Sequence, residues 1–159
     1  MFFQSAQFAY DNDRIRRDEA RRKRAVGDTI ERLLAADELD SESVVGLTER
    51  FRFPFAVSLL ASELRKSPWS HCPIQVLLDR RASDMLRLQR IGVIIGAIRP
   101  RHDKCCVPPD IGQLRKTRPG RIALAACGFP IAPYSRLTRR ERAALILGKI
   151  TAAMRERPS

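Results

Sequence analysis

Histidine and cysteine side chains are the first groups in this chain that could do chemistry. His71 and Cys72 are adjacent, and His102 is followed by Cys105 and Cys106. Imidazole and thiolate groups are the usual ligands of zinc, so the pairs His71–Cys72 and His102–Cys105 form a candidate zinc site. The spacing is not that of a standard zinc motif, and Cys105 and Cys106 cannot easily both point at one ion. We therefore expect no metal and no other cofactor, with this zinc site as the weaker alternative.

A catalytic role has less support than a binding role. A thiolate of Cys105 or Cys106 beside a histidine would need an orienting acid and an oxyanion donor, and the sequence identifies neither. The chain holds no phosphate-cradling glycine loop, no HExxH motif and no GxSxG motif. Cys127 lies in an apolar segment, where a thiol acts as a small hydrophobic side chain. We therefore expect a binding protein rather than an enzyme.

Arginine and lysine supply the other chemistry available to this chain. The 159 residues carry 30 basic and 18 acidic side chains, a net charge of +12. Residues 1–79 hold 12 basic and 13 acidic side chains, whereas residues 80–159 hold 18 and 5. Such a basic half favours a polyanionic partner, with nucleic acid ahead of an anionic membrane. The alternative is that the excess is compositional, because 25 of the 30 basic residues are arginine.

Ten residues of the basic half are the predicted nucleic-acid contacts, with duplex DNA as the favoured partner. Arginines near the start of the last predicted helix would contact phosphates or base edges. A second basic group, between residues 115 and 121, would brace the backbone, and a tyrosine and a serine could add hydrogen bonds. The ten are Arg115, Lys116, Arg118, Arg121, Tyr134, Ser135, Arg136, Arg139, Arg140 and Arg142.

Apolar spacing and capping residues predict the helices that would position these side chains. The small apolar run 122–127 predicts a tightly packed helix, and Gly128 stands where a helix C-cap needs positive φ. Pro130 then blocks continuation. Thr138 and Glu141 form a T-x-x-E capping box, which predicts a second helix. Apolar residues recur at helical spacing from there to Met154, so we expect one face of this helix to be buried.

A helix, a glycine turn and a basic second helix are the parts of a helix-turn-helix DNA reader. The fragment ALAACGF, followed by Tyr134-Ser135-Arg136, resembles the first helix-turn-helix of arabinose-operon-type activators. The chain departs from that family at Pro133, where the recognition helix should continue. For this fragment alone, two core helices joined by a proline-rich loop are slightly favoured. A second candidate, residues 44–66, has Arg52 where the turn usually needs glycine, so we expect an ordinary αα-hairpin there.

The N-terminal segment, residues 1–25, combines aromatic and basic side chains. Its aromatics are Phe2, Phe3, Phe8 and Tyr10, and we expect them to pack on the body, with a partner contact as the alternative. A helix capped by residue 11, 12 or 13 should follow and run to Arg24. It lacks an apolar stripe, so we expect it to be exposed. Such a helix could contact a nucleic-acid backbone, although a solvated, self-paired helix is favoured.

Further helices are predicted along the rest of the chain. They cover residues 26–36, a segment from a cap near Asp40 through Phe51, residues 55–66, and segments beginning at Pro73 and Ser83. Trp69 is expected in the core. Residues 99–121 are proline-rich and basic, and are predicted as an irregular loop with one short helix near residues 110–116. The run IGVII is assigned to a helix rather than a strand.

The sequence thus predicts an all-α protein with a proline-rich basic loop and possible helix-turn-helix units. A single helical domain, residues 26–159, has an acidic-to-neutral half (26–79) and a basic half (80–159). The chain shows no secretory signal and no membrane span, so we expect a cytoplasmic protein. The favoured function is a nucleic-acid-binding, DNA-directed transcriptional regulator or accessory factor. Alternatives are an adaptor or homodimer that docks through the acidic surface at residues 28–42, and an RNA- or ribosome-associated protein.

Overall fold

The structure is a computed structural model that describes residues 2–64, 69, 71–100 and 108–158, with side chains from residue 6 onward. These residues form helices and connecting turns, without a strand, which confirms the predicted all-α class. The elements are α1 (Phe2–Ala35), α2 (Ser41–Gly46), α3 (Phe53–Glu63), α4 (His71–Leu78), α5 (Asp84–Ile94), α6 (Ile111–Leu114), α7 (Arg118–Ala126), the 3-10 turn η2 (Tyr134–Arg136) and α8 (Arg139–Glu156).

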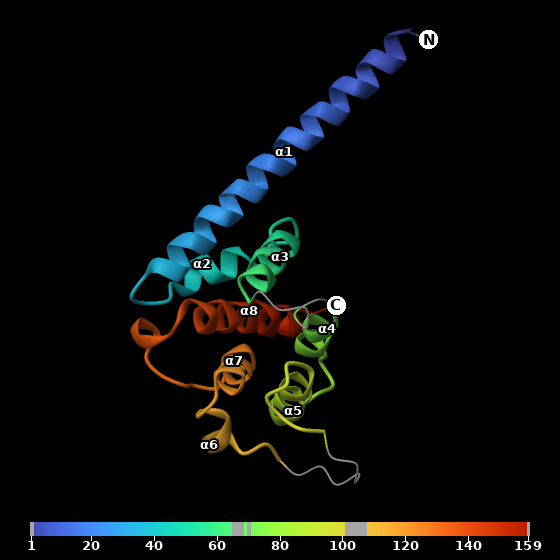
Figure 1. The fold of residues 1–159 in the computed structure, drawn as a ribbon. Helices are drawn as coiled ribbons and strands as arrows, with labels where there is room; N and C mark the ends of the chain where they lie inside the picture. Colours follow the sequence, from blue (N-terminus) through green and yellow to red (C-terminus); the bar gives the residue numbers. More distant parts are fainter. Residues whose placement is uncertain (1, 65–68, 70, 101–107, 159) are drawn as a thin grey trace.

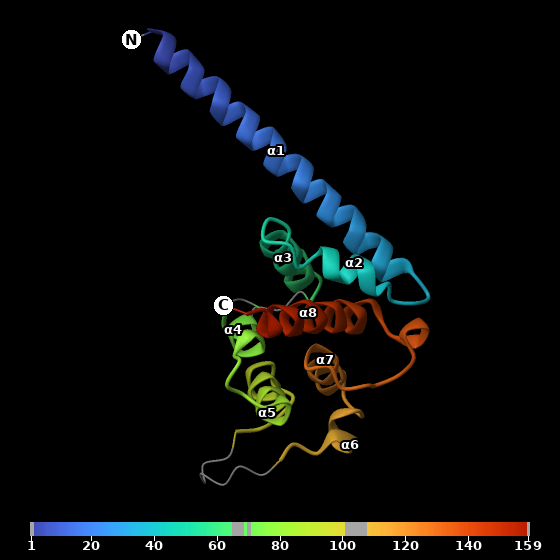
Figure 2. The same ribbon diagram turned by 180° about the vertical axis from the view of Figure 1, so that it is seen from behind.

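Helix α8 runs through the middle of the molecule. Helices α1, α2 and α3 lie on one side of it, α5, α6 and α7 lie on the other, and α4 packs near its C-terminal end (Figure 1). The view from behind shows the same separation (Figure 2). Ala143, Ile146, Leu147 and Ile150 of α8 are fully buried. Burial on both sides explains why small and aliphatic residues surround most of this helix, rather than lining one stripe.

Local sequence signals set several helix ends as predicted. The side chains of Asp40, Ser83 and Thr138 accept backbone hydrogen bonds at the starts of α2, α5 and α8. Helix α7 ends in a left-handed Gly128, with φ of +83°. The amide of Gly128 donates to Ala125 O, and the next amide donates to Leu124 O, which is a Schellman motif. The run IGVII is helical up to Ile94, and Trp69 is buried, both as expected.

Other predicted helix ends were wrong. Helix α2 stops at Gly46, well before Phe51, which is exposed. Helix α4 begins at His71, ahead of Pro73. Helix α7 begins inside the segment predicted to be irregular, because the side chain of Thr117 accepts from the amide of Gly120 and a proline fits the first turn.

The largest correction concerns the N-terminal segment. One continuous helix runs from Phe2 to Ala35, so the predicted helix start at residues 11–13 is wrong. The predicted packing of the N-terminal aromatics on the body is also wrong for those whose side chains are described. Phe8 and Tyr10 are 70% and 65% exposed. The predicted exposure of the basic part of this helix is confirmed, since Arg14 to Arg24 are exposed apart from the partly covered Asp18.

Helices of the described residues do not combine the length and the apolar character that a membrane crossing would require.

Candidate nucleic-acid interface

The starts of α7 and α8 are fastened together by one buried carboxylate. Glu141 Oε1 accepts from the amide of Thr138 at 3.0 Å, and the Thr138 hydroxyl accepts from the amide of Glu141 at 3.2 Å. This reciprocal pair is the predicted capping box. Arg121 of α7 then donates from Nε to Glu141 Oε2 at 2.6 Å. Burial of Glu141 raises its pKa, but the hydrogen bonds from Arg121 and Thr138 outweigh burial and leave the pKa below its usual value.

The two helices therefore begin on the same side of their shared contact. Arg121 and Glu141 meet near both N-terminal ends, while Ala126, the last residue of α7, packs against Gly148 in the middle of α8. The joined starts of α7 and α8 define one end of this helix pair. Both starts are capped, α7 by the Thr117 side chain and α8 by Thr138 and Glu141, so attraction of anions to this end depends on exposed basic side chains.

Five exposed basic side chains come from the segments around this end. We call them the basic end: Arg115, Lys116, Arg118, Arg136 and Arg140. The first three lie on the α6–α7 turn and the first residue of α7, and the last two lie in η2 and at the start of α8. Arg115 Nη2 donates to Pro130 O at 3.1 Å, which ties the α6–α7 turn to the loop before η2. Within the described chain, no carboxylate pairs with any of the five.

Three other arginines among the ten predicted contacts are engaged by partners within the chain, although Arg139 remains exposed. Arg121 is the partner of Glu141 described above. Arg139 Nη2 lies 2.6 Å from Glu31 Oε1 of α1, and its Nε lies 2.8 Å from Glu63 Oε2 of α3. These two carboxylates raise the pKa of Arg139 further above its usual value. Arg139 therefore connects three helices, and it shows that one acid of the 28–42 surface pairs with the basic half of the same chain.

Arg142 closes the C-terminal end of α1. Its Nη1 donates to Leu34 O at 2.6 Å and to Ala36 O at 2.9 Å. The guanidinium also lies 4.6 Å from the ring centroid of Tyr134, whose hydroxyl donates to Leu33 O at 2.5 Å. These donors satisfy carbonyls that a helix end leaves without partners. Arg142 and Tyr134 thus fasten α1 to α8 and η2, which leaves little of either side chain for a ligand.

Tyr134 and Ser135 face an acidic loop. Together with Pro133 they line a hollow whose other wall is Asp37, Glu38 and Leu39. Carboxylates at this position repel a phosphate backbone. Of the ten predicted contacts, the structure therefore leaves the five of the basic end open to a polyanion and places the other five in internal contacts or beside acids.

Sequence spacing gave no sign of a second use of arginine in this chain. Arg80 donates to the carbonyls of Met154 and Arg157 at the end of α8, and Arg155 donates to Leu77 O at the end of α4. Arg87 reaches the carbonyls of Asp79 and Ala82 between α4 and α5. Partners lie up to 109 residues away, as for Arg157 and Thr48, so only the folded chain reveals them. Part of the arginine excess is thus structural.

The cysteine and histidine candidates do not assemble into a site within the described residues. His71 and Cys72 are exposed at the start of α4, and no group of three or more potential ligands occurs in the part of the chain that the structure covers. His102 and Cys105 lie outside that part. Cys127 packs against the core, and burial raises the pKa of its thiol to about 12.

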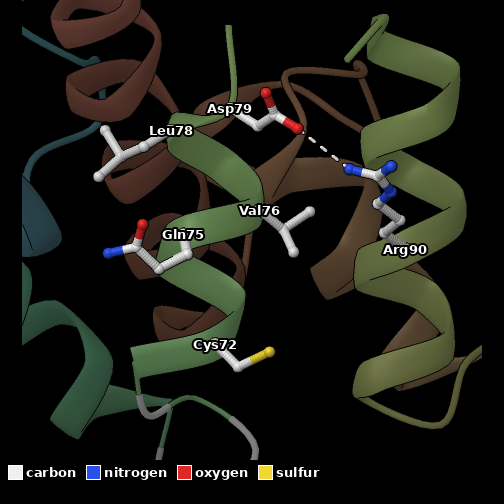
Figure 3. Close-up of a pocket in the computed structure, with 6 residues that line it drawn as sticks. All are labelled: Cys72, Gln75, Val76, Leu78, Asp79 and Arg90. Atoms are coloured by element: carbon white, nitrogen blue, oxygen red, sulfur yellow. Dashed lines mark hydrogen bonds and ion pairs between the residues drawn. The ribbon is translucent and has the colours of Figure 1, made fainter. Parts of the chain in front are cut away.

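A shallow hollow between α4 and α5 contains Cys72 (Figure 3). Its lining also includes Gln75, Val76 and an ion pair in which Arg90 Nη1 lies 3.1 Å from Asp79 Oδ2. Cys72 and Asp79 stand at opposite ends of this hollow, with a full helix length between them. The Asp79 carboxylate accepts from the amide of Arg81 and is paired with Arg90, so its pKa is lowered. The described residues of this hollow form neither a thiol–base pair nor a metal cluster.

The basic end is therefore the strongest candidate site in the described chain, and it rests on geometry and charge. Comparisons of the sequence with models of protein families and with curated proteins, and of the structure with solved structures, returned no match.

Proposed function

We propose that this protein binds nucleic acid, with duplex DNA as the favoured form, through the basic end. The observation that carries the proposal is the set of five exposed basic side chains, without carboxylate partners in the described chain, around the joined starts of α7 and α8. Binding of this kind neutralises phosphates and releases counterions, so it does not need a catalytic group. A role in transcription regulation would follow if the contact were sequence-selective.

The internal ion pairs support this assignment because they fix the surface. The Arg121–Glu141 contact and the Thr138 capping box hold the two helix starts in one arrangement. Contacts built on a helix are more precise than contacts on a free loop, which applies to Arg118 and Arg140. Phosphate contacts from the α6–α7 turn and η2, beside Arg140 at the start of α8, would set the register of the protein on a duplex.

The test is a salt titration of binding to a short duplex, with matched charge removal. The variant R118Q/R136Q/R140Q takes three charges from the basic end. The control R50Q/R81Q/K149Q takes three charges from exposed residues elsewhere, which have no ion-pair partner in the described chain. Both variants have the same net charge, and neither touches the structural residues Arg121, Arg139 and Arg142.

We expect wild type and control to bind with the same steep dependence on salt. The basic-end variant should bind more weakly, and its plot of log affinity against log salt should be shallower by about three, one for each lost phosphate contact. Equal losses in both variants would mean that only the overall charge matters, and the proposal would be rejected. Absence of duplex binding by wild type at physiological salt would reject it as well.

A further inference from the structure

The N-terminal part of α1 projects from the body as an arm, which we define as residues 2–25. Val26, Ile30 and Leu33 of the same helix are buried, but residues 6–25 are exposed or only partly covered. The arm stands clear of the other helices in both views (Figures 1 and 2). Arg22, whose guanidinium lies 4.8 Å from the ring centroid of Phe51, marks where it leaves the body. At 1.5 Å per residue, the arm is about 36 Å long.

Four arginines form a stripe along the outer face of this arm. Arg14, Arg17, Arg21 and Arg24 follow one another at steps of three, four and three residues, which places them on one side of a helix. Each residue turns the helix by about 100°, so Arg17 lies half a turn around from the buried Val26, nine residues later. We call these four residues the outer stripe. Since Val26 faces the body, the outer stripe faces away from it.

The guanidinium groups of the outer stripe are available to a ligand. Arg14 and Arg17 have no hydrogen-bond or ion-pair partner within the described chain. Arg21 lies 3.6 Å from Asp18, but its side chain remains 77% exposed. Arg24 Nε reaches only a carbonyl of its own helix, at 3.5 Å. Residues 6–25 hold seven basic and four acidic side chains, so the arm as a whole is also positive.

The acidic residues of the arm explain how it stays helical without packing. Asp18 lies 3.6 Å from Arg21, and Asp13 and Glu19 each precede a basic residue by four positions without a direct ion pair in the described chain. Opposite charges at these spacings favour a helix, and a helix that is polar on all sides depends on them. These pairs do not neutralise the arm. The arm is thus a preformed helix with a basic outer face, rather than a segment that must fold on its ligand.

We propose that the outer stripe is a second DNA contact and that the protein bridges two duplex segments. This inference rests on the proposed function, which supplies the first contact at the basic end. A major groove about 12 Å wide admits an α-helix, and arginines along one face of that helix can reach the flanking phosphates. The outer stripe covers about 15 Å of helix, which is similar to the width of about 12 Å of the major groove.

Bridging follows from where the two basic surfaces lie. The arm leaves the body on the α3 side of α8, whereas α6 and α7 lie on the opposite side (Figures 1 and 2). Duplex DNA has a persistence length of about 150 base pairs, so a short duplex behaves as a rod. One short rod that lies against α6, α7 and the start of α8 does not also follow the outer stripe. Two separate duplexes can occupy the two surfaces together.

Other partners fit the arm less well. A helix that lies in a membrane surface needs a continuous apolar face opposite its basic face. In the arm that face carries Phe8 and Ile15, but Asn12 and Glu19 interrupt it. Double-stranded RNA has a deep, narrow major groove that a helix does not enter. Duplex DNA is therefore the occupant that matches both the charge and the shape of the arm.

The test is a two-duplex capture assay with the full chain. One duplex is fixed to beads, a second carries a fluorophore, and the captured fluorescence is measured at physiological salt. The variant R14Q/R17Q removes two charges from the outer stripe. The control R16Q/K23Q removes two charges from other faces of the same arm. Glutamine matches arginine and lysine closely in helix propensity, and far-UV circular dichroism of both variants checks that the arm stays helical.

We expect wild type and R16Q/K23Q to capture the second duplex equally, and R14Q/R17Q to capture about tenfold less at the same protein concentration. All three should still bind a single duplex through the basic end. Capture by R14Q/R17Q at the wild-type level would overturn the inference, as would an equal loss in R16Q/K23Q. Equal capture of a double-stranded RNA would rule out seating in a DNA groove.

Two further outcomes separate this inference from the function on which it rests. If wild type binds a single duplex through the basic end but does not capture a second one, bridging is rejected and the proposed function stands. If R118Q/R136Q/R140Q binds a single duplex as well as wild type, the proposed function is rejected, and the bridging inference loses its first contact. Phosphatidylserine-containing vesicles provide the last comparison. A loss of vesicle binding in R14Q/R17Q, with DNA capture unchanged, would assign the arm to membranes and overturn the inference.

Discussion

Arg139 and Arg140 are neighbours in the sequence, yet they stand in different environments. Both side chains are exposed, but residue 139 pairs with the carboxylates of Glu31 and Glu63, while residue 140 has no ion-pair or hydrogen-bond partner in the described chain. Successive residues of a helix point about 100° apart, so one faces α1 and α3 and the other faces solvent. A run of arginines can therefore contain both side chains that stabilise the fold and side chains that are free to bind a ligand. The variants for a binding test must be selected from the contacts in the structure.

Glu141 provides the first prediction at this scale. Its folded-state pKa is lowered, since Arg121 and the amide of Thr138 stabilise the charged form more than burial opposes it. A lowered carboxyl pKa stabilises the fold above the unfolded pKa, near pH 4.3, and this contribution is lost as pH falls through the folded pKa. We expect E141Q to lower the free energy of unfolding by about 1–3 kcal/mol at pH 7. Below about pH 4 the difference from wild type should shrink.

Urea unfolding at neutral and acidic pH measures this difference. The control is E156Q, an exposed glutamate near the end of α8 that has no ion-pair partner in the described chain. It should leave the free energy of unfolding nearly unchanged at both pH values. A difference between E141Q and wild type that is as large in acid as at neutral pH would show that the carboxylate charge is not what stabilises the junction of α7 and α8.

At the scale of elements, the contact between α7 and α8 depends on missing side chains. A Cβ added at Gly148 of α8 would overlap the carbonyl oxygen of Ala126, and one added at Gly120 of α7 would overlap Leu114 O. The neighbouring atoms are backbone, which cannot move aside as a flexible side chain could. Close approach at Gly148 places the end of α7 on the middle of α8, and close approach at Gly120 places α7 against the end of α6.

Two glycine-to-alanine changes separate close packing from helix propensity. At Gly148, alanine should destabilise the protein by about 1–3 kcal/mol, because the overlap forces α7 away from α8. At Gly27 of α1, the nearest atom to an added Cβ is Leu59 Cδ1 at 4.0 Å, so the new methyl group fits. There, alanine should stabilise the fold by up to about 1 kcal/mol through lower unfolded-state entropy. Thermal and urea unfolding of G148A and G27A, measured side by side, test both signs. Equal effects in the two variants would contradict this account.

How far the sequence predicts these elements depends on the range of the forces involved. Thr138, Glu141 and Gly128 act on residues only a few positions away, so the sequence alone predicts the start of α8 and the end of α7. The contacts of Arg139 with Glu31 and Glu63 join residues 108 and 76 positions apart, and no local pattern encodes them. The sequence predicts the five residues of the basic end among ten nucleic-acid contacts. Only the folded structure distinguishes these five from the arginines that stabilise the fold.

The N-terminal helix shows the same limit in another form. The absence of an apolar stripe between residues 11 and 24 correctly predicts exposure, because that property is local. The packing of Phe8 and Tyr10 was inferred from the general cost of exposing aromatic rings, and the structure leaves both rings exposed. Whether an aromatic ring finds a partner depends on the direction in which the helix leaves the body. That direction is set at Val26, Ile30 and Leu33, far along the chain.

At the scale of the whole molecule, α8 separates two surfaces of different character. One side holds α1, α2 and α3 with the acidic loop at Asp37 and Glu38, and the other holds α6 and α7 with three residues of the basic end. The other two, Arg136 and Arg140, lie in η2 and at the start of α8. The arm adds a second basic surface beyond the acidic one. This alternation of charge disfavours a single broad contact with DNA. It favours separate contacts, which is the arrangement that bridging requires.

Hydrogen exchange provides a prediction for the whole chain. Amides of residues 6–21 lie in a helix without tertiary packing, so local opening should let them exchange much faster than amides near Ile30 and Leu33, which exchange only when the body opens. Addition of duplex DNA should slow exchange in two separated places, the arm and the segments of the basic end. Protection of the basic end alone would limit the protein to one contact. Slow exchange of the arm without DNA would mean that the arm already packs against another surface, such as a second copy of the chain, and the outer stripe would then not be free for DNA.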